Sequence, residues 1–302
     1  MNELEKLSKE NQENYLRYLK RMTESMKTST KGLIPVMCSN SKNILDVGCG
    51  SGVVMEAIEE INANATISGL DLNIESIEKL KKLGKKWKLY HMNILDMHDM
   101  KFDTIIYSSV LHEISSYCPY SKYRFTSEPI REAFRKTNEL LEMNGSIILR
   151  DGLLVPKDSR NEKVRISFSN PDEREWLFRF QNDFQGFKKM PDVDRTIVQI
   201  GVNDYLVGLT FLKEFLYTYT WGAESYPREV MERFGILSKE EWISLLEENG
   251  FSIETIIESK EEYEKYLSPK VTLNLADGTK FIYPMMTILI KAKKNKELIK
   301  SR

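Results

Sequence analysis

The residues most able to do chemistry in this 302-residue chain form a glycine turn and two aspartates. The turn is Gly48-Cys49-Gly50-Ser51-Gly52, directly after an apolar run that contains Asp46. Glycines permit a tight turn and let a ligand approach the backbone. Asp71 follows 21 residues after Gly50, at the end of the next apolar run. A carboxylate at that distance accepts hydrogen bonds from the two hydroxyls of a ribose, so the pair predicts a nucleoside site.

The spacing of the glycines favours a positively charged nucleoside ligand. A dinucleotide site has the order G-x-G-x-x-G and a helix N-terminus that holds pyrophosphate. Here the order is G-x-G-x-G, and Asp46 precedes it. Asp46 would repel a phosphate and attract an ammonium or a sulfonium. The alternatives are a tight turn with a solvated acid and, as a function, an NAD-dependent oxidoreductase.

The elements around this turn predict a doubly wound α/β domain with a mostly parallel sheet. Short apolar runs that alternate with amphipathic segments are typical of such a fold, and ligands bind at the carboxyl ends of its strands. A last apolar run, Met285–Ile290, is expected to insert antiparallel, and Ser238 with Glu241 opens the helix before the preceding strand. The predicted strands are 43–47, 66–70, 88–92, 104–108, 146–149 and 251–257, and the predicted helices include 53–61 and 74–83.

A change of pattern after Asp151 predicts an insertion in this domain. Pro171–Phe187 and Asp204–Trp221 have helical patterns rich in aromatic residues, and no strand is expected to interrupt them. Such an insertion would lie above the carboxyl ends of the strands as a lid over the substrate. Its aromatic side chains form either its own core or a substrate box.

The predicted organisation therefore has four parts. Residues 1–42 form an N-terminal helical segment that covers the cofactor site, because Leu4 to Met26 has apolar residues at helical spacing. Residues 43–154 and 236–292 form the α/β domain, and 155–235 form the mainly helical lid inserted after the fifth strand. Residues 293–302 are a lysine-rich tail that faces solvent.

The glycine turn and its strand resemble the first motif of the class I S-adenosylmethionine-dependent methyltransferases. The resemblance covers about 43–150 and 238–292 and implies a Rossmann-like fold with S-adenosyl-L-methionine as the cofactor. It also implies methyl transfer to an oxygen or nitrogen of an acceptor. Asn93 stands where the family usually has an acid, and it keeps an oxygen for the adenine amino group. The implied cofactor-binding residues are Asp46, Gly48, Cys49, Gly50, Gly52, Asp71, Leu72, Asn93, Ile94 and Ser108.

The residues after the fourth strand supply the catalytic candidates. His112 is expected to be either a general base for a hydroxyl acceptor or a residue that binds through hydrogen bonds. Glu113 either holds a substrate cation or faces solvent, and Tyr117 and Asp151 are further candidates. Arg150 and Asp151 either meet the ligand at the sheet edge or form a buried ion pair.

Composition excludes several classes of function. The net charge of -1 gives no general attraction to nucleic acid or to an anionic membrane. No apolar run is long enough to span a bilayer, and the polar first residues do not resemble a secretory signal, so a cytoplasmic protein is expected. The 3 cysteines and 3 histidines have no metal-ligand spacing, so no metal centre is predicted.

A small or mid-sized organic acceptor is the favoured substrate, and two alternatives stay open. No N-P-P-Y or D-P-P-Y tetrad follows the fourth strand, which disfavours a nucleobase acceptor by resemblance. The first alternative is an RNA methyltransferase whose insertion contacts phosphates. The second is a non-catalytic module that binds S-adenosylmethionine and a protein partner. The sequence predicts no oligomeric state. The basic residues available for RNA are Arg160, Lys163, Arg165, Lys188 and Lys189.

Overall fold

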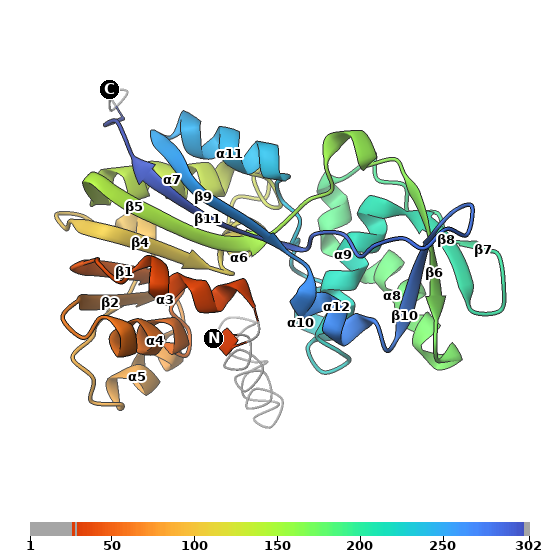
Figure 1. Cartoon of the computed structure of the whole chain (residues 1–302), viewed down its shortest axis with the longest axis horizontal. Helices are drawn as coiled ribbons and strands as arrows, with labels where there is room; N and C mark the ends of the chain where they lie inside the picture. The colour runs from red at the N-terminus through yellow and green to blue at the C-terminus, as the bar shows by residue number, and fades with distance from the viewer. Residues whose placement is uncertain (1–25, 28, 299–302) are drawn as a thin grey trace.

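The computed structural model describes residues 26, 27 and 29–298, which form two lobes side by side (Figure 1). The predicted helix from Leu4 to Met26 lies outside the described residues except for its last member. The described chain begins with the short helices η1 (Thr30–Leu33) and α3 (Ile34–Met37). Among the described residues, no helix combines the length and the apolar character that crossing a bilayer requires.

A seven-stranded sheet forms the first lobe, in the order β3-β2-β1-β4-β5-β11-β9. β11 runs antiparallel to both β5 and β9, whereas the pairs among β1 to β5 are parallel. This confirms the predicted doubly wound sheet with an antiparallel last strand. The strands are β1 (Asn43–Val47), β2 (Thr66–Asp71), β3 (Lys88–His91), β4 (Phe102–Ser108), β5 (Leu141–Gly152), β9 (Phe251–Ser259) and β11 (Thr287–Lys294).

Helices cover both faces of this sheet, because neighbouring residues of each strand point to opposite faces and both are apolar. Ile44 packs in the core beneath α3, α4 and α5, and Leu45 packs in the core beneath α6, α7 and α11. Ser238 and Glu241 form the predicted capping box of α11. The helices are α4 (Val53–Ile61), α5 (Ile74–Lys81), η2 (Ile94–Asp96), α6 (Leu111–Ser116), α7 (Glu128–Leu140) and α11 (Lys239–Glu248).

The second lobe, which we define as residues 155–235 and 260–286, has its own aromatic core and its own sheet. The order of that sheet is β10-β6-β8-β7, and all its pairs are antiparallel. Its elements are η3 (Lys157–Ser159), β6 (Lys163–Phe168), η4 (Pro171–Arg174), α8 (Glu175–Asp183), η5 (Gln185–Lys189), β7 (Val198–Gln199), β8 (Asp204–Gly208), α9 (Leu209–Thr220), α10 (Tyr226–Glu229), α12 (Glu261–Leu267) and β10 (Val271–Leu275).

Two predictions about this lobe are wrong. The sequence predicted helix from Asp204, but Asp204–Gly208 is strand β8, and α9 begins only at Leu209. The sequence also assigned all of residues 236–292 to the α/β domain, but β10 within this range pairs with β6 and so belongs to the second lobe. Both errors have one cause: these strands are stabilised by partners far away in the chain, and a local pattern does not reveal such pairing.

The predicted lysine-rich tail is also shorter than expected. β11 continues through Lys294, whose side chain is 0% exposed. Its ammonium donates hydrogen bonds to the carbonyl oxygens of Asn138 at 2.6 Å and Leu141 at 3.0 Å. These carbonyls lie at the C-terminal end of α7, where the helix leaves acceptors without intrahelical donors. Lys294 is therefore a buried structural residue.

Candidate active site

The glycine turn lies between β1 and α4 in a conformation that favours glycine. Gly48, Gly50 and Gly52 have φ angles of 70°, 49° and 78°. A Cβ atom on Gly48 would lie 2.5 Å from Cγ2 of Val110, so the packing there excludes a side chain. At Gly50 the nearest atom would be 3.9 Å away. The turn is therefore packed on one side and leaves the backbone of Gly50 open to a ligand.

Asp71 ends β2 next to this turn, and its carboxylate fixes two loops. One oxygen accepts a hydrogen bond from the Gly50 N–H at 2.8 Å, and the other accepts from the Asn73 N–H at 2.8 Å. Each oxygen keeps a further lone pair. Leu72, the next residue, is 64% exposed beside it. A carboxylate with two available lone pairs and an adjacent exposed apolar side chain suits the ribose and the base of a nucleoside.

The remaining predicted cofactor residues divide into edge and core positions. Asn93 follows β3, the neighbour of β2, and its side chain accepts from the Leu95 N–H at 3.0 Å. Ser108 ends β4, and among the described residues its buried hydroxyl has no hydrogen-bond partner. Cys49 and Ile94 are 6% and 4% exposed and pack in the two cores of the sheet. The side chains of Cys49 and Ile94 therefore pack below the carboxyl edge of the sheet and do not face a ligand there.

Asp46 on β1 faces a residue that the sequence analysis missed, Lys31 in η1. Asp46 is 2% exposed and Lys31 is 3% exposed. Burial raises the pKa of Asp46 to about 7, and the Lys31 charge opposes that rise. Burial and then the Arg150 charge lower the pKa of Lys31 to about 8. No hydrogen bond or ion pair is found for the Lys31 ammonium in the described part of the chain. A buried acid and a buried base whose charges act on each other suit an amino-acid zwitterion.

A cavity of about 50 Å³ lies beside these residues, where the sheet edge meets the second lobe. Ser109 contributes from the end of β4, and Trp221, Phe234 and Tyr263 contribute aromatic surface from the second lobe. Ser108, which the sequence placed next to the reaction, does not line the cavity, whereas Ser109 does. The charged and titratable lining groups are Lys31, His112, Glu113, Arg150, Asp151, Arg228, Glu229, Glu232 and Glu262.

His112 begins α6 and is held on two sides. Its Nδ1 lies 2.7 Å from a carboxylate oxygen of Asp151, and its Nε2 lies 3.5 Å from an oxygen of Glu232. The ring also stacks on Phe234 with centroids 4.6 Å apart. A carboxylate only accepts, so Nδ1 carries a hydrogen and Nε2 faces the cavity. Burial alone would lower the pKa of His112, but Asp151 and Glu232 outweigh it and raise that pKa well above its usual value.

Asp151 positions this histidine from the end of β5. One oxygen accepts from the backbone N–H groups of Leu111 at 2.8 Å and His112 at 3.2 Å, at the start of α6. The other accepts from the His112 ring and from the Gly152 N–H at 2.7 Å. Four donors thus hold the carboxylate, which fixes both the helix start and the imidazole.

Glu232 completes the arrangement from the second lobe, 120 residues after His112 in the chain. Its other oxygen accepts a hydrogen bond from the Tyr117 hydroxyl at 2.9 Å, and Arg228 lies 3.8 Å away. Burial would raise the pKa of Glu232, but the His112 and Arg228 contacts lower it overall. Burial, followed by Glu232, raises the pKa of Tyr117 above its usual range. Tyr117 is therefore a hydrogen-bond donor that orients Glu232.

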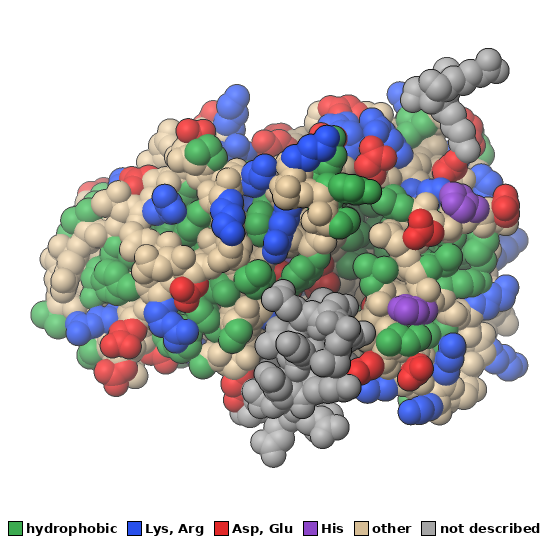
Figure 2. Space-filling view, turned by 180° about the vertical axis from the view of Figure 1, so that it is seen from behind, with side chains coloured by type: hydrophobic (Ala, Val, Ile, Leu, Met, Phe, Trp, Pro, Cys, Tyr) green, Lys and Arg blue, Asp and Glu red, His purple; other side chains and the backbone are tan. Residues whose placement is uncertain are grey.

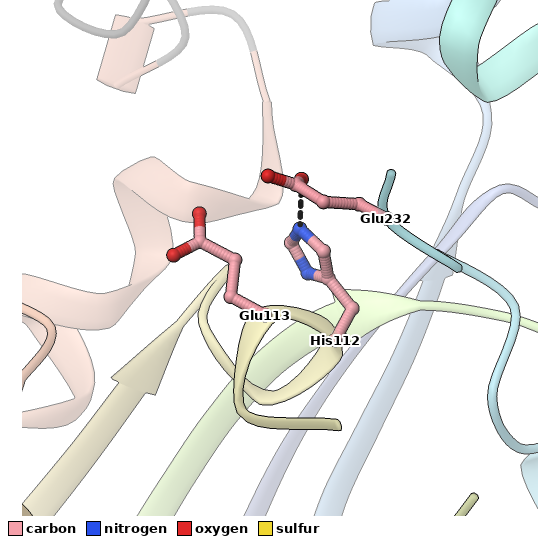
Figure 3. Close-up of side chains that lie close together, drawn as sticks. All are labelled: His112, Glu113 and Glu232. Atoms are coloured by element: carbon pink, nitrogen blue, oxygen red, sulfur yellow. Dashed lines mark ion pairs between the residues drawn. The ribbon is translucent and has the colours of Figure 1, made fainter. Parts of the chain in front are cut away.

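Glu113 is the remaining acid of this group, and Figure 3 shows its carboxylate beside the ring of His112, near the end of the ring that meets Glu232. We call His112, Glu113 and Glu232 the charged cluster. One ligand atom from each lies within 4.8 Å of the others. The Glu113 carboxylate is without an ion pair or hydrogen bond among the residues described. Burial and then Glu232 raise the pKa of Glu113 to about 8.

The structure thus brings together all four predicted catalytic residues and adds three that the sequence analysis missed, Lys31, Arg228 and Glu232. Arg150 lines the cavity and forms a buried ion pair with Glu262 at 2.6 Å, and its contact with a ligand stays a prediction. No local motif marks Lys31 or Glu232, since only the packing of distant segments places them here.

Comparison with known proteins agrees with this geometry. Residues 39–179, which contain the glycine turn, Asp71 and His112, match the model of a family described as a methyltransferase domain. No curated protein matches the sequence.

Several solved structures share the fold at low sequence identity. Human N-acetylserotonin methyltransferase, solved with S-adenosylmethionine, is 12% identical with a TM-score of 0.50, over 95% of this chain and 58% of that chain. The plantazolicin methyltransferase BamL is 16% identical with a TM-score of 0.50, over 95% of this chain and 91% of that chain. The pyocyanin biosynthetic protein PhzM is 14% identical with a TM-score of 0.46, over 87% of this chain and 53% of that chain. The chain thus spans little more than half the length of two of these proteins.

The strand order and the glycine turn define a Rossmann-like fold, and residues 39–179 within it match a methyltransferase domain. The cofactor that the resemblance of the glycine turn implies is S-adenosyl-L-methionine. The residues present fit that cofactor, because the open backbone at Gly50, the lone pairs of Asp71 and the pair of Asp46 with Lys31 match a nucleoside joined to an amino acid.

Proposed function

We propose that the protein is an S-adenosylmethionine-dependent enzyme that methylates an oxygen or nitrogen of a small or mid-sized organic acceptor, which binds between the sheet edge and the second lobe. One observation carries this proposal. The cavity beside Asp46 is lined both by the ends of β4 and β5 and by aromatic and charged side chains of the second lobe. Human N-acetylserotonin methyltransferase and BamL, whose names state organic acceptors, have the same fold.

The cofactor is assigned to the edge formed by β1, β2, β3 and β4. When bound, S-adenosylmethionine supplies a methyl group on a positively charged sulfur. Asp71 would accept the ribose hydroxyls, Leu72 would flank the adenine, and Asn93 would contact its amino group. Asp46 would pair with the ammonium of the methionine part and Lys31 with its carboxylate. Ser108, Cys49, Ile94 and the glycines 48, 50 and 52 would shape the floor of this site.

The charged cluster is assigned to the acceptor. His112 and Glu113 face the cavity and would touch the acceptor and move its proton, whereas Asp151 and Tyr117 act through His112 and Glu232 as positioning residues. Holding an acceptor in line with the methyl group supplies about 7–11 kcal/mol of the barrier. A positioned base adds about 10²–10⁴-fold when the nucleophile is a hydroxyl.

The second lobe is assigned the role of the lid. It closes one side of the cavity with Trp221, Phe234 and Tyr263, which excludes water and strengthens electrostatic interactions inside. A cavity of about 50 Å³ holds the reacting end of an acceptor. Binding of a whole mid-sized molecule therefore requires the lobes to open, as lids commonly do.

The pairing of basic residues favours a small molecule over RNA. Arg160, Lys163 and Arg165 of the insertion form ion pairs with Glu241, Asp194 and Asp204. On the face drawn in Figure 2, basic and acidic side chains are both spread over the two lobes. RNA binding relies on basic side chains that are available to phosphates. A cytoplasmic location stays a prediction of the sequence.

Incubation with methyl-labelled S-adenosylmethionine and a cell extract tests the proposal. We expect the label in the small-molecule fraction, and none after His112→Ala. Label in the RNA fraction, with RNA affinity that falls steeply with salt, would favour the RNA alternative. Tight binding of the cofactor without label in any fraction would indicate a non-catalytic module.

A further inference from the structure

The charges around the cavity do not balance. Arg150 pairs with Glu262, and Arg228 pairs with Glu229. His112 lies nearest to Asp151. Glu232 has only outer ionic contacts, with His112 at 3.5 Å and Arg228 at 3.8 Å, and Glu113 has no ion pair among the described residues. The described groups that line the cavity thus include five carboxylic acids, Glu113, Asp151, Glu229, Glu232 and Glu262, against four basic groups, Lys31, His112, Arg150 and Arg228.

Glu232 is buried and Glu113 is half-buried. A carboxylate that is withdrawn from water without a full partner is costly, so such a pair is expected where a cation binds. We propose that Glu113 and Glu232 bind a protonated amine of the acceptor, so that the enzyme is an amine N-methyltransferase. This inference rests on the proposed function and names its substrate class.

The contacts of the charged cluster leave one acid available to a ligand. Nε2 of His112 lies 3.5 Å from an oxygen of Glu232, and one ligand atom from each of the three residues lies within 4.8 Å of the others. Both Glu232 oxygens and Nδ1 of His112 are held by other groups, which leaves Glu113 as the acid without a partner among the described residues.

The walls of the cavity also suit an organic cation. Trp221, Phe234 and Tyr263 present aromatic side chains around the charged cluster. Aromatic faces attract ammonium groups, and they attract alcohols less because an alcohol has no net charge. An acceptor amine attached to an apolar body would therefore find both charge and apolar surface here.

The chemistry balances without any further reactant. The acceptor ammonium gives one proton to the Glu113 carboxylate, which passes it to solvent. The nitrogen lone pair then forms the new N–C bond while the C–S bond breaks, and the electron pair of that bond stays on sulfur. The methylated product again carries one positive charge. Glu113 and Glu232 thus keep a cationic partner from binding to release.

The test uses the small-molecule fraction of a cell extract and labelled S-adenosylmethionine. Labelled products are separated by cation exchange near neutral pH, and a second sample has its primary and secondary amines acetylated beforehand. We expect the label to be retained on the cation exchanger and to be lost after acetylation. Label in neutral or anionic products would overturn the inference and leave the proposed function intact, whereas a total absence of labelled small molecules would contradict the proposed function itself.

Two variants test whether Glu113 binds the amine. Glu113→Gln should raise KM for the amine acceptor about tenfold or more, because a charged hydrogen bond becomes neutral, while the affinity for S-adenosylhomocysteine stays the same. Glu128→Gln, the same change on the exposed start of α7, is the matched control and should change neither quantity. An unchanged KM in Glu113→Gln would contradict the assignment of this residue.

Calorimetry with MgCl₂, MnCl₂ and ZnCl₂ tests whether the charged cluster binds a metal ion instead of an amine. We expect no saturable metal binding that depends on Glu113. Metal binding that is present in the wild type and lost in Glu113→Gln would overturn the inference and assign the charged cluster to a divalent cation.

Discussion

The two sides of the site, which we assign to the cofactor and to the acceptor, are built in different ways. On the cofactor side, Asp71 bonds to the backbone at Gly50 and Asn73, and left-handed glycines set the path of the turn. On the acceptor side, His112, Asp151 and Glu232 come from three distant segments and are held by ionic contacts. The first side is a backbone cradle, and the second is a set of side chains. Acceptor specificity can therefore change by single substitutions while the cofactor site remains constant.

The largest expected effect is a loss of turnover in His112→Ala without a loss of cofactor affinity. His112→Ala should lower kcat by about 10²-fold or more, because the variant lacks the imidazole that contacts the acceptor and holds Glu232 in place. The Kd for S-adenosylmethionine should change little, since the ring does not touch the cradle. Steady-state kinetics and calorimetry measure both values, and His98→Ala on the exposed surface is the control. A weaker Kd with the same kcat would place His112 on the cofactor side.

A change in the cradle should give the reverse pattern. Asp71→Ala should raise the Kd for S-adenosylmethionine about 30- to 100-fold, because two hydrogen bonds from a charged carboxylate to a ribose are lost. Calorimetry with S-adenosylhomocysteine measures the effect apart from turnover. Asp96→Ala, an exposed aspartate in η2, is the control. An unchanged Kd in Asp71→Ala would refute the ribose assignment.

Lys31 tests whether the buried base belongs to the cofactor side. Lys31→Met should weaken S-adenosylmethionine about tenfold, because one charge-assisted hydrogen bond to the methionine carboxylate is lost. The same variant should bind decarboxylated S-adenosylmethionine as well as the wild type does. Equal losses for both compounds would show that Lys31 supports the fold or the acceptor instead.

The smallest effect is a pH dependence that arises from Asp46. Burial raises the pKa of this carboxyl to about 7 in the protein without ligand, and only its ionised form attracts an ammonium. Lowering the pH from about 7 to 6 should therefore weaken S-adenosylmethionine about fivefold. Asp46→Asn should bind more weakly and lose this pH dependence. An affinity that rises toward low pH would contradict the sign of the effect.

The sequence predicted the first lobe well because its signals are local. β1 and α4 have the predicted bounds, since a short apolar run and an amphipathic segment flank the glycine turn. The second lobe was predicted less well. α9 is buried along its whole length and has no polar face, and the strand before it pairs with partners far away in the chain.

The same distinction applies to the site. Asp46, Asp71 and the glycines belong to one contiguous motif, so their proximity follows from the strand order. Glu232 reaches His112 only because the second lobe folds back onto the sheet, and Lys31 reaches Asp46 through η1. Side chains that meet through tertiary packing leave no spacing in the sequence that would predict them.

A crystal structure of the complex with S-adenosylhomocysteine tests most directly whether the two sides meet. We predict both ribose hydroxyls on Asp71 and the sulfur at the mouth of the cavity, facing His112 and Glu113. A sulfur that points away from the cavity, or a ribose held by other residues, would contradict the account.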